Sequence, residues 1–166
     1  MRLRPTIGAD RAFVSDGLFQ FMNPVFSERY PGFNNWYKNK LIPGFLTDER
    51  IIFSILDKGP LGVSILKAQP RKAPGVKLSS FYIAPEIRGM GFGRQMLAAT
   101  CAFVDQEHCG PVVVTVPEES LTSEAGDAFS HLLNEFLFQS IAVVPDRYRS
   151  GKKELVFRRK DLSPDR

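Results

Sequence analysis

A glycine-rich stretch in the middle of the chain has the residue types needed to bind an anion. It reads Arg88, Gly89, Met90, Gly91, Phe92, Gly93 and Arg94. Glycine lets the backbone turn tightly and removes side chains that would keep a ligand away. Because the stretch follows an apolar strand and precedes a helix, the free N–H groups of the turn and of the helix start would face one site. With an arginine on each side, the pattern predicts a pyrophosphate site.

The spacing of these glycines excludes two common nucleotide-binding motifs. A dinucleotide site needs Gly-x-Gly-x-x-Gly near the start of a βαβ unit, with an acidic residue about 20 positions later. Here the glycines follow Gly-x-Gly-x-Gly and lie in mid-chain. A Walker A loop ends in Gly-Lys-Ser/Thr, whereas this one ends in Gly93-Arg94-Gln95. The alternative that involves no ligand is a tight bend between a strand and a helix.

The turn resembles the Arg/Gln-x-x-Gly-x-Gly/Ala signature of the GNAT superfamily of N-acetyltransferases, with Arg88, Gly91 and Gly93 at its fixed positions. The strand that ends at Ala84-Pro85 and the amphipathic helix after the turn have the order of that family's central motif. The resemblance implies that the turn binds the pyrophosphate of coenzyme A, that the preceding strand pairs with its pantetheine arm, and that acetyl-CoA is the cosubstrate with no metal. The implied cofactor-binding residues are Phe81, Tyr82, Ile83, Arg88, Gly89, Met90, Gly91, Phe92, Gly93 and Arg94.

Two carboxylates are the best-placed candidates for a general base. Glu118 and Glu119 directly follow the valine-rich segment 112–116, beside which the acceptor enters in the fold that the chain resembles. An alkyl ammonium with a pKa of about 10.4 costs roughly 4 to 5 kcal/mol to deprotonate at pH 7, whereas an α-amine near 7.7 costs about 1 kcal/mol. A base, acting directly or through water, therefore matters most for alkyl amines. The alternative is two solvated residues that favour a helix start.

The residue that protonates the leaving thiolate is not where the family usually has it. The family places a tyrosine five residues before the phenylalanine of a Gly-Phe pair. Here Leu137-Phe138 replaces that pair and puts Leu133 at the tyrosine's position, or His131 after a shift of two. Tyr148, in a predicted hairpin loop, is the other candidate acid. The alternatives are a surface histidine and a tyrosine that covers a sheet edge.

An early aromatic segment borders the acceptor site in the fold that the chain resembles. Phe33, Trp36 and Tyr37 therefore are candidates to line a substrate pocket. Packing in the core is the alternative for each of them.

Hydrophobic periodicity and turn residues predict the strands and helices given below, and the resemblance implies that they form an α/β (α+β) fold with a mixed, mostly antiparallel central sheet of six to seven strands flanked by helices. This is the acyl-CoA N-acyltransferase fold. We expect a single domain over 1–166, with the cofactor motif at 76–108 and a C-terminal hairpin at 138–160. The expected strands are 2–7, 50–56, 61–68, 76–84, 111–116, 138–144 and 154–159. The expected helices are 9–22, ended by Pro24, a second one to Ile42, 94–108, and one from 122 or 123 to about 135.

Composition narrows the class of protein. The 166 residues are 43% hydrophobic and 24% charged, as in ordinary globular domains. No signal peptide or membrane-spanning run is visible, and Cys101 and Cys109 are too few for a disulfide framework, so we expect a cytoplasmic protein. The net charge is +4. Basic residues are concentrated near the C-terminus, as is typical of a solvated face. No base-stacking motif accompanies them, which disfavours a nucleic-acid partner. These basic residues are Arg147, Arg149, Lys152, Lys153, Arg158, Arg159 and Lys160.

Two functional classes follow from the resemblance. The first is an acetyl-CoA-dependent N-acetyltransferase that acts by direct attack of a primary amine, from a small molecule or a peptide. The second is a catalytically weak module of the same fold that binds acyl-CoA or regulates a partner. Dimers are frequent in the superfamily, so a homodimer is an open alternative to a monomer.

Overall fold

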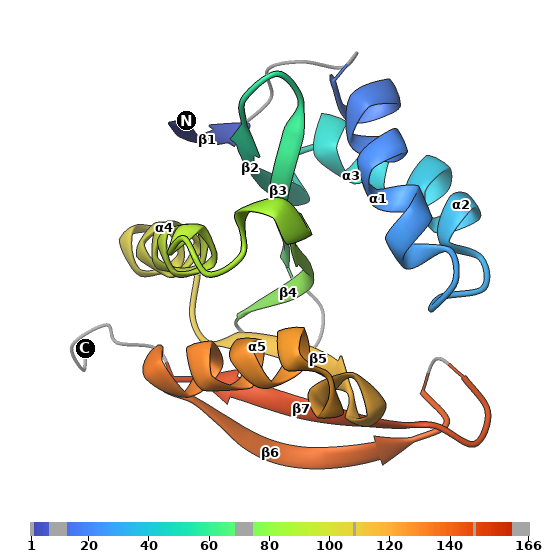
Figure 1. Ribbon diagram of the computed structural model, residues 1–166, viewed down its shortest axis with the longest axis vertical. Helices are drawn as coiled ribbons and strands as arrows, with labels where there is room; N and C mark the ends of the chain where they lie inside the picture. The colour runs from blue at the N-terminus through green and yellow to red at the C-terminus, as the bar shows by residue number, and fades with distance from the viewer. Residues whose placement is uncertain (1, 7–12, 69–74, 108, 148, 161–166) are drawn as a thin grey trace. The chain divides into compact units, whose positions relative to one another are not determined.

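The computed structural model describes residues 2–6, 13–68, 75–107, 109–147 and 149–160 (Figure 1). The chain divides into two compact units. The first unit is Met1–Lys67 with Ser80–Met96, and the second is Ala68–Ser79 with Leu97–Arg166. Strand β4 (Val76–Ile83) and helix α4 (Phe92–Gln106) each pass from one unit into the other. The described strands, seven in number, follow the order β1-β2-β3-β4-β5-β7-β6. This mixed, mostly antiparallel sheet with helices confirms the predicted fold class.

The strands of the first unit form at the predicted places. β1 (Arg2–Thr6) pairs antiparallel with β2 (Arg50–Leu56), and β2 pairs antiparallel with β3 (Pro60–Ala68). The pairing shifts register between Ile55 and Leu56, next to the turn that joins β2 to β3. Most side chains of β2 and β3 are buried, as their nearly continuous apolar composition predicts.

The first helix runs past its predicted end at residue 22, while residues 9–12 of the predicted span lie outside the described residues. After a π-helical turn, Phe13–Gly17, helix α1 runs over Leu18–Phe26 and contains Pro24. The prediction that Pro24 ends the helix is therefore wrong. A proline this close to the end removes one hydrogen bond of the final turn, while the ring of Phe26 stacks on those of Tyr30 and Phe33 at 6.2 and 5.6 Å between centroids. These contacts hold the last turn in place.

The second helical segment also runs past its predicted end. It consists of α2 (Phe33–Trp36), a π-helical turn (Tyr37–Leu41) and α3 (Ile42–Leu46). It thus ends at Leu46 rather than Ile42, because Pro43 lies in the first turn of α3, where its missing N–H has no helical partner to lose. The Thr47 hydroxyl donates to the Pro43 carbonyl at 3.0 Å and closes the helix. Helices α1, α2 and α3 lie together beside the β2–β3 hairpin (Figure 1).

Helix α4 begins two residues earlier than predicted. Its first residue is Phe92 and its last is Gln106, against a predicted span of 94–108. The Gln95 N–H donates to the Gly91 carbonyl at 3.1 Å, so the first helical turn closes on Gly91. Gly93 and Arg94 therefore belong to the first turn of the helix.

The second unit contains the C-terminal half of the sheet. β5 (Val112–Pro117) pairs in parallel with the first half of β4 and antiparallel with β7 (Lys153–Arg159), which pairs antiparallel with β6 (Phe138–Pro145). A 3₁₀ turn, Glu118–Thr122, leads from β5 into α5 (Glu124–Glu135). The Ser123 hydroxyl accepts a hydrogen bond from the Gly126 N–H at 3.1 Å and caps α5, in agreement with the predicted helix start at 122 or 123. Helix α5 lies along this part of the sheet (Figure 1).

A partly buried ion pair ties α4 to β7 within the second unit. The two terminal nitrogens of Arg159 donate to the two carboxylate oxygens of Asp105, each at 2.7 Å. Arg159 is only 5% exposed, so the prediction that the whole C-terminal basic run is a solvated face is wrong at this residue. The alternation of β7 turns Arg159 toward α4.

The cysteines of the described chain are free. Cys101 is buried in α4, and burial raises the pKa of its thiol to about 11. Among the helices whose residues are described, none has the length and apolar character needed to cross a membrane.

Candidate functional site

The turn between β4 and α4 has an open backbone. Gly89 and Gly91 have φ values of 74° and 81°, in the left-handed region that L side chains rarely adopt. A Cβ atom built at either glycine would meet no other heavy atom within 4 Å. The glycines therefore leave free space in front of the backbone, which is what the approach of a ligand requires.

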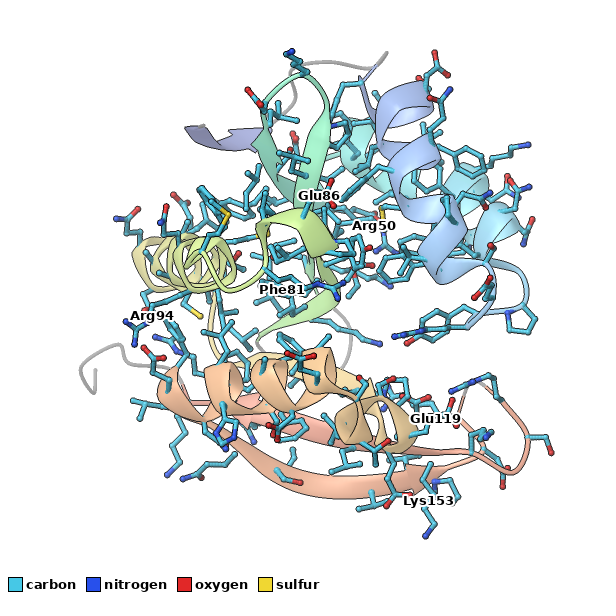
Figure 2. All side chains as sticks on the ribbon, viewed as in Figure 1. Arg50, Phe81, Glu86, Arg94, Glu119 and Lys153 are labelled. Atoms are coloured by element: carbon cyan, nitrogen blue, oxygen red, sulfur yellow. The ribbon has the colours of Figure 1, made fainter. Side chains whose placement is uncertain are left out.

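Positive charge and free N–H groups surround this turn. The first N–H groups of a helix have no acceptor within the helix, and the helix dipole favours an anion there. Arg94 lies exposed in the first turn of α4, as Figure 2 shows. Arg88 is exposed as well; its Nε donates to the Ile83 carbonyl at 2.9 Å, and its guanidinium lies 5.6 Å from the centroid of the Tyr82 ring. These two contacts fix the arginine at the start of the turn. The residues present fit a pyrophosphate.

The strand before the turn is anchored on both of its faces. Phe81 and Ile83 pack against a small cluster of buried residues that includes Ile87 and Met96. The intervening Tyr82 turns the other way and meets the rings of Phe21 and Phe26 at centroid distances of 5.4 and 6.1 Å. The side chains of the three candidates Phe81, Tyr82 and Ile83 are half-buried. Their side chains therefore position the strand.

The remaining two residues of the predicted cofactor set differ in exposure. Met90, at the tip of the turn, is 62% exposed. Phe92, the first residue of α4, is half-buried against the same small cluster as Phe81. Phe92 thus anchors the helix start, and Met90 adds exposed apolar surface beside the glycines.

Two of the three aromatic residues predicted for the acceptor lie in the core instead. Phe33 is 4% exposed and Tyr37 1% exposed, and the Tyr37 hydroxyl donates to the Val14 carbonyl. The assignment of these two residues to a substrate pocket is corrected to core packing, because α1, α2 and the π-helical turn bury their rings against each other and against Phe19.

Trp36 is half-buried at the edge of this cluster and contacts a residue that sequence reasoning missed. The guanidinium of Arg50 lies 5.3 Å from the centroid of the Trp36 ring, and its Nε donates to the Lys40 carbonyl at 3.0 Å. Arg50 is 7% exposed, and burial lowers the pKa of its guanidinium. The arginine thus fastens β2 to the second helical segment. A charged first residue of an apolar strand was the only signal for it in the sequence.

The two glutamates after β5 have different surroundings. Glu119 binds Arg149 Nη2 through Oε1 at 2.5 Å and Lys152 Nζ through Oε2 at 2.7 Å. The hydrogen bonds from Lys152 and Arg149 lower the pKa of the Glu119 carboxyl. Glu118 is exposed. Figure 2 shows Glu119 beside the loop that joins β6 to β7. Glu119 therefore fastens this loop, and its lowered pKa makes it the weaker proton acceptor.

The candidate acids receive little support from their positions. The His131 side chain is 78% exposed on α5, with Nε2 at 3.6 Å from Asp127 Oδ2. Leu133, at the position of the family's usual tyrosine, is fully buried. Tyr148 lies outside the described residues. A solvated histidine and a buried leucine give α5 no evident proton donor among its described residues.

A buried acidic residue on β7 was missed by sequence reasoning. Glu154 is 1% exposed, and neither of its carboxylate oxygens has a hydrogen-bond partner. On β5, the buried Thr115 hydroxyl oxygen also lacks one. In the sequence Glu154 follows Lys152 and Lys153 and resembles part of a solvated charged run. Only the strand pairing reveals that it faces inward.

The structure groups the candidate residues unit by unit. All the predicted cofactor residues and the three aromatic residues belong to the first unit. Glu118, Glu119 and His131 belong to the second unit, as do Thr115, Arg149 and Glu154.

Comparison with known proteins identifies relatives of this architecture. The model of the acetyltransferase (GNAT) family matches residues 16–125. Among solved structures, one of a putative GNAT acetyltransferase from Desulfovibrio desulfuricans has a TM-score of 0.72 at 16% identity, covering 97% of this chain and 99% of that one. An aminoglycoside 6'-N-acetyltransferase complexed with coenzyme A has a TM-score of 0.72 at 12% identity over all of both chains. Ribosomal-protein-S5-alanine acetyltransferase from Vibrio fischeri has a TM-score of 0.70 at 11% identity, covering 99% and 94%. No curated protein matches at a significant level.

Proposed function

Because the chain belongs to the acetyltransferase (GNAT) family, we propose that it is an N-acetyltransferase that transfers an acetyl group from acetyl-CoA to a primary amine by direct attack. The observation that carries the proposal is the turn at Gly89 and Gly91, where two left-handed glycines leave open space before the backbone. An ordinary bend, such as the one at Gly32, shows the same open space, so the two flanking arginines and the helix start are what distinguish this turn as an anion site.

The chain's own groups have separate tasks in this proposal. The N–H groups of the turn and of the first turn of α4 would hold the pyrophosphate, with Arg88 and Arg94 adding charge. The backbone of β4 around Tyr82 would bind the pantetheine arm and donate an N–H toward the carbonyl oxygen, where negative charge develops. When bound, acetyl-CoA supplies an acyl carbon activated as a thioester.

The reaction also requires two proton transfers, one from the amine and one to the leaving thiolate. The attacking amine must lose a proton, which for an alkyl ammonium costs roughly 4 to 5 kcal/mol at pH 7. The leaving thiolate needs less help, since thiols have pKa values of about 8.5. A buried leucine at the position of the family's acid is therefore compatible with turnover. Among the two carboxylates predicted from the sequence, Glu118 is the better base, because the cations around Glu119 lower the pKa of that carboxyl.

The acceptor class is an amine of a small molecule or of a peptide. The names of two structural neighbours, an aminoglycoside acetyltransferase and a ribosomal-protein-alanine acetyltransferase, support both kinds. A module that binds acyl-CoA without efficient transfer is the second candidate. The burial of Leu133 and the exposure of His131 favour it, because they leave α5 without an evident acid among its described residues.

One assay separates the two candidates. Release of free thiol from acetyl-CoA would be followed with a panel of amines, and the acetylated product identified by mass spectrometry. Thiol release that requires both the amine and the protein establishes the transferase. Saturable acetyl-CoA binding without amine-dependent thiol release would contradict it in favour of the module.

A further inference from the structure

The buried carboxylate of Glu154 needs an explanation. Buried polar groups are nearly always hydrogen-bonded, and an uncompensated buried ion costs several kcal/mol. Glu154 is 1% exposed, yet both of its oxygens lack a partner. Its neighbours across the sheet are Pro117 on β5 and Val144 on β6, neither of which has a polar side chain. Because burying this carboxylate without a partner lowers the stability of the fold, Glu154 is a candidate for binding a ligand.

The strand register gathers further polar side chains on the same face of the sheet. Residues directly opposite each other in a pair of strands share a face, and so do residues two apart along a strand. The pairs Pro117–Glu154 and Thr115–Val156 therefore put Thr115 and Glu154 on one face. The parallel pair Lys77–Val113 brings Lys77 to it as well. The opposite face carries Arg159, which binds Asp105 of α4.

The loop between β6 and β7 adds an unsatisfied donor. Arg149 binds Glu119 through Nη2, but its Nε is buried and has no partner. We call Lys77, Thr115, Glu119, Arg149 and Glu154 the polar corner. The Glu154 carboxylate and the Arg149 Nε are buried groups of opposite charge, and each has unused hydrogen-bonding capacity in this structure.

The polar corner presents charges of both signs. The charged groups that act on Glu154 are Arg149 and Arg147 of the loop, Lys77 of β4 and Glu119 of the 3₁₀ turn. A ligand with one charge of each sign can place its cationic group at the Glu154 carboxylate and its anionic group at a cation.

From this arrangement we infer that the polar corner takes an acceptor that carries an amine and an acidic group on one small molecule, as an α-amino acid does, with Glu154 holding the amine and Arg149 the acidic group. The inference rests on the proposed function, because it names the acceptor of that transfer. In the transfer, the ammonium loses one proton, the nitrogen forms its bond to the acyl carbon as the carbon–sulfur bond breaks, and the nitrogen's second proton leaves with the thiolate.

The surroundings of Glu154 suit this task. Burial is the largest effect on its carboxyl and raises the pKa, and it outweighs the opposing effect of Arg149 and Arg147. A raised pKa makes the carboxylate a better proton acceptor than Glu119.

The test observes Glu154 directly in the full chain. Protein labelled with ¹³C at the glutamate carboxyl would be titrated with a pool of the common α-amino acids and, separately, with a pool of the corresponding amino-acid amides. The Glu154 resonance is the one missing from Glu154→Gln. We expect a saturable shift with the amino acids, at least 10-fold weaker binding of the amides, and a loss of amino-acid affinity of about 10- to 100-fold in Arg149→Gln. Glu107→Gln and Lys153→Gln, at exposed positions of the same unit and, for Lys153, on the opposite face of β7, serve as matched controls and should bind normally.

Each other outcome has a definite meaning. A Glu154 resonance that responds to neither pool overturns the inference, and amides that bind as well as amino acids overturn the role of the acidic group. Thiol release with some amine while the resonance stays unchanged leaves the transferase standing and removes this acceptor site. A saturable shift with amino acids but no thiol release keeps the binding site and removes the transfer.

Discussion

The glycine turn, Arg88–Arg94, and the polar corner offer binding groups of opposite kinds. The turn consists of neighbours in the sequence, and its donors are backbone N–H groups at open glycines. The polar corner consists of side chains from segments as far apart as Lys77 and Glu154, brought together by strand pairing. The turn therefore suits a ligand that every family member shares, whereas the corner can change by single substitutions and suits the ligand that distinguishes one member from another.

The largest expected effect is on the glycine turn. Gly91→Trp fills the open space before the backbone and should weaken acetyl-CoA binding at least ~100-fold, or about 2.8 kcal/mol, measured by calorimetry. Gly32→Trp is the matched control, because Gly32 also has a left-handed φ, of 92°, and open space around it. Both variants carry the backbone strain of roughly 1–2 kcal/mol, so a similar loss of binding in Gly32→Trp would remove the special role of the turn.

The second prediction concerns the ion pair between Asp105 and Arg159, which joins α4 to β7, a strand of the polar corner. Asp105→Asn removes the two-bond contact with Arg159, whose side chain is 6% exposed while that of Asp105 is 32% exposed, and should lower the free energy of unfolding by about 2 to 3 kcal/mol. The melting temperature should fall by roughly 5–10 °C. Asp127→Asn, whose side chain is 69% exposed, should change it by less than about 2 °C. Equal effects of the two substitutions would show that the ion pair does not hold β7 to α4.

The third prediction uses the raised pKa of Glu154. A carboxyl with a higher pKa in the folded than in the unfolded state destabilises the fold above the folded pKa, and the cost disappears below the unfolded value near 4.5. Glu154→Gln should therefore raise the free energy of unfolding by about 1 kcal/mol at pH 7 to 8, and the gain should shrink toward pH 4.5. Denaturant unfolding across this range measures it. A loss of stability at neutral pH would mean that Glu154 has a partner in solution, with Arg149 the first candidate.

The smallest effect is expected at His131. Because its side chain is solvated on α5, His131→Gln should change the turnover rate by less than about 2-fold and stability by no more than about 0.5 kcal/mol. The thiol-release assay and thermal unfolding measure the two quantities. A turnover rate lowered by about two orders of magnitude, as loss of a general acid would cause, would restore the histidine as the acid.

The sequence predicted what depends on neighbours along the chain. The glycines, the arginines and the strand and helix around them are local features, and their order carried both the fold class and the family. The ends of the helices were harder to predict from the sequence. The rule that proline ends helices failed at Pro24, because this proline lies in a final turn that aromatic packing holds in place. The second helical segment runs past Ile42 and through Pro43 to the threonine that closes it.

The parts that were missed depend on pairing between distant segments. Phe33 and Tyr37 are buried because the early helices fold onto each other, which no local pattern announces. Glu154 and Arg159 stand in a run that is rich in charge, and only the register of β7 with β5 turns both inward. A sequence gives the residues of such a corner, but only the strand register shows that they share one face of the sheet.

The decisive experiment on the glycine turn is a ¹⁵N chemical-shift titration of the wild-type protein with coenzyme A. We expect the largest shifts on the amides of Gly89, Gly91 and Gly93 and on the first turn of α4, and we expect them to saturate with the ligand. Saturable shifts confined to other segments, or no shift at near-millimolar ligand, would contradict the assignment of the turn to the cofactor and leave it as a structural bend.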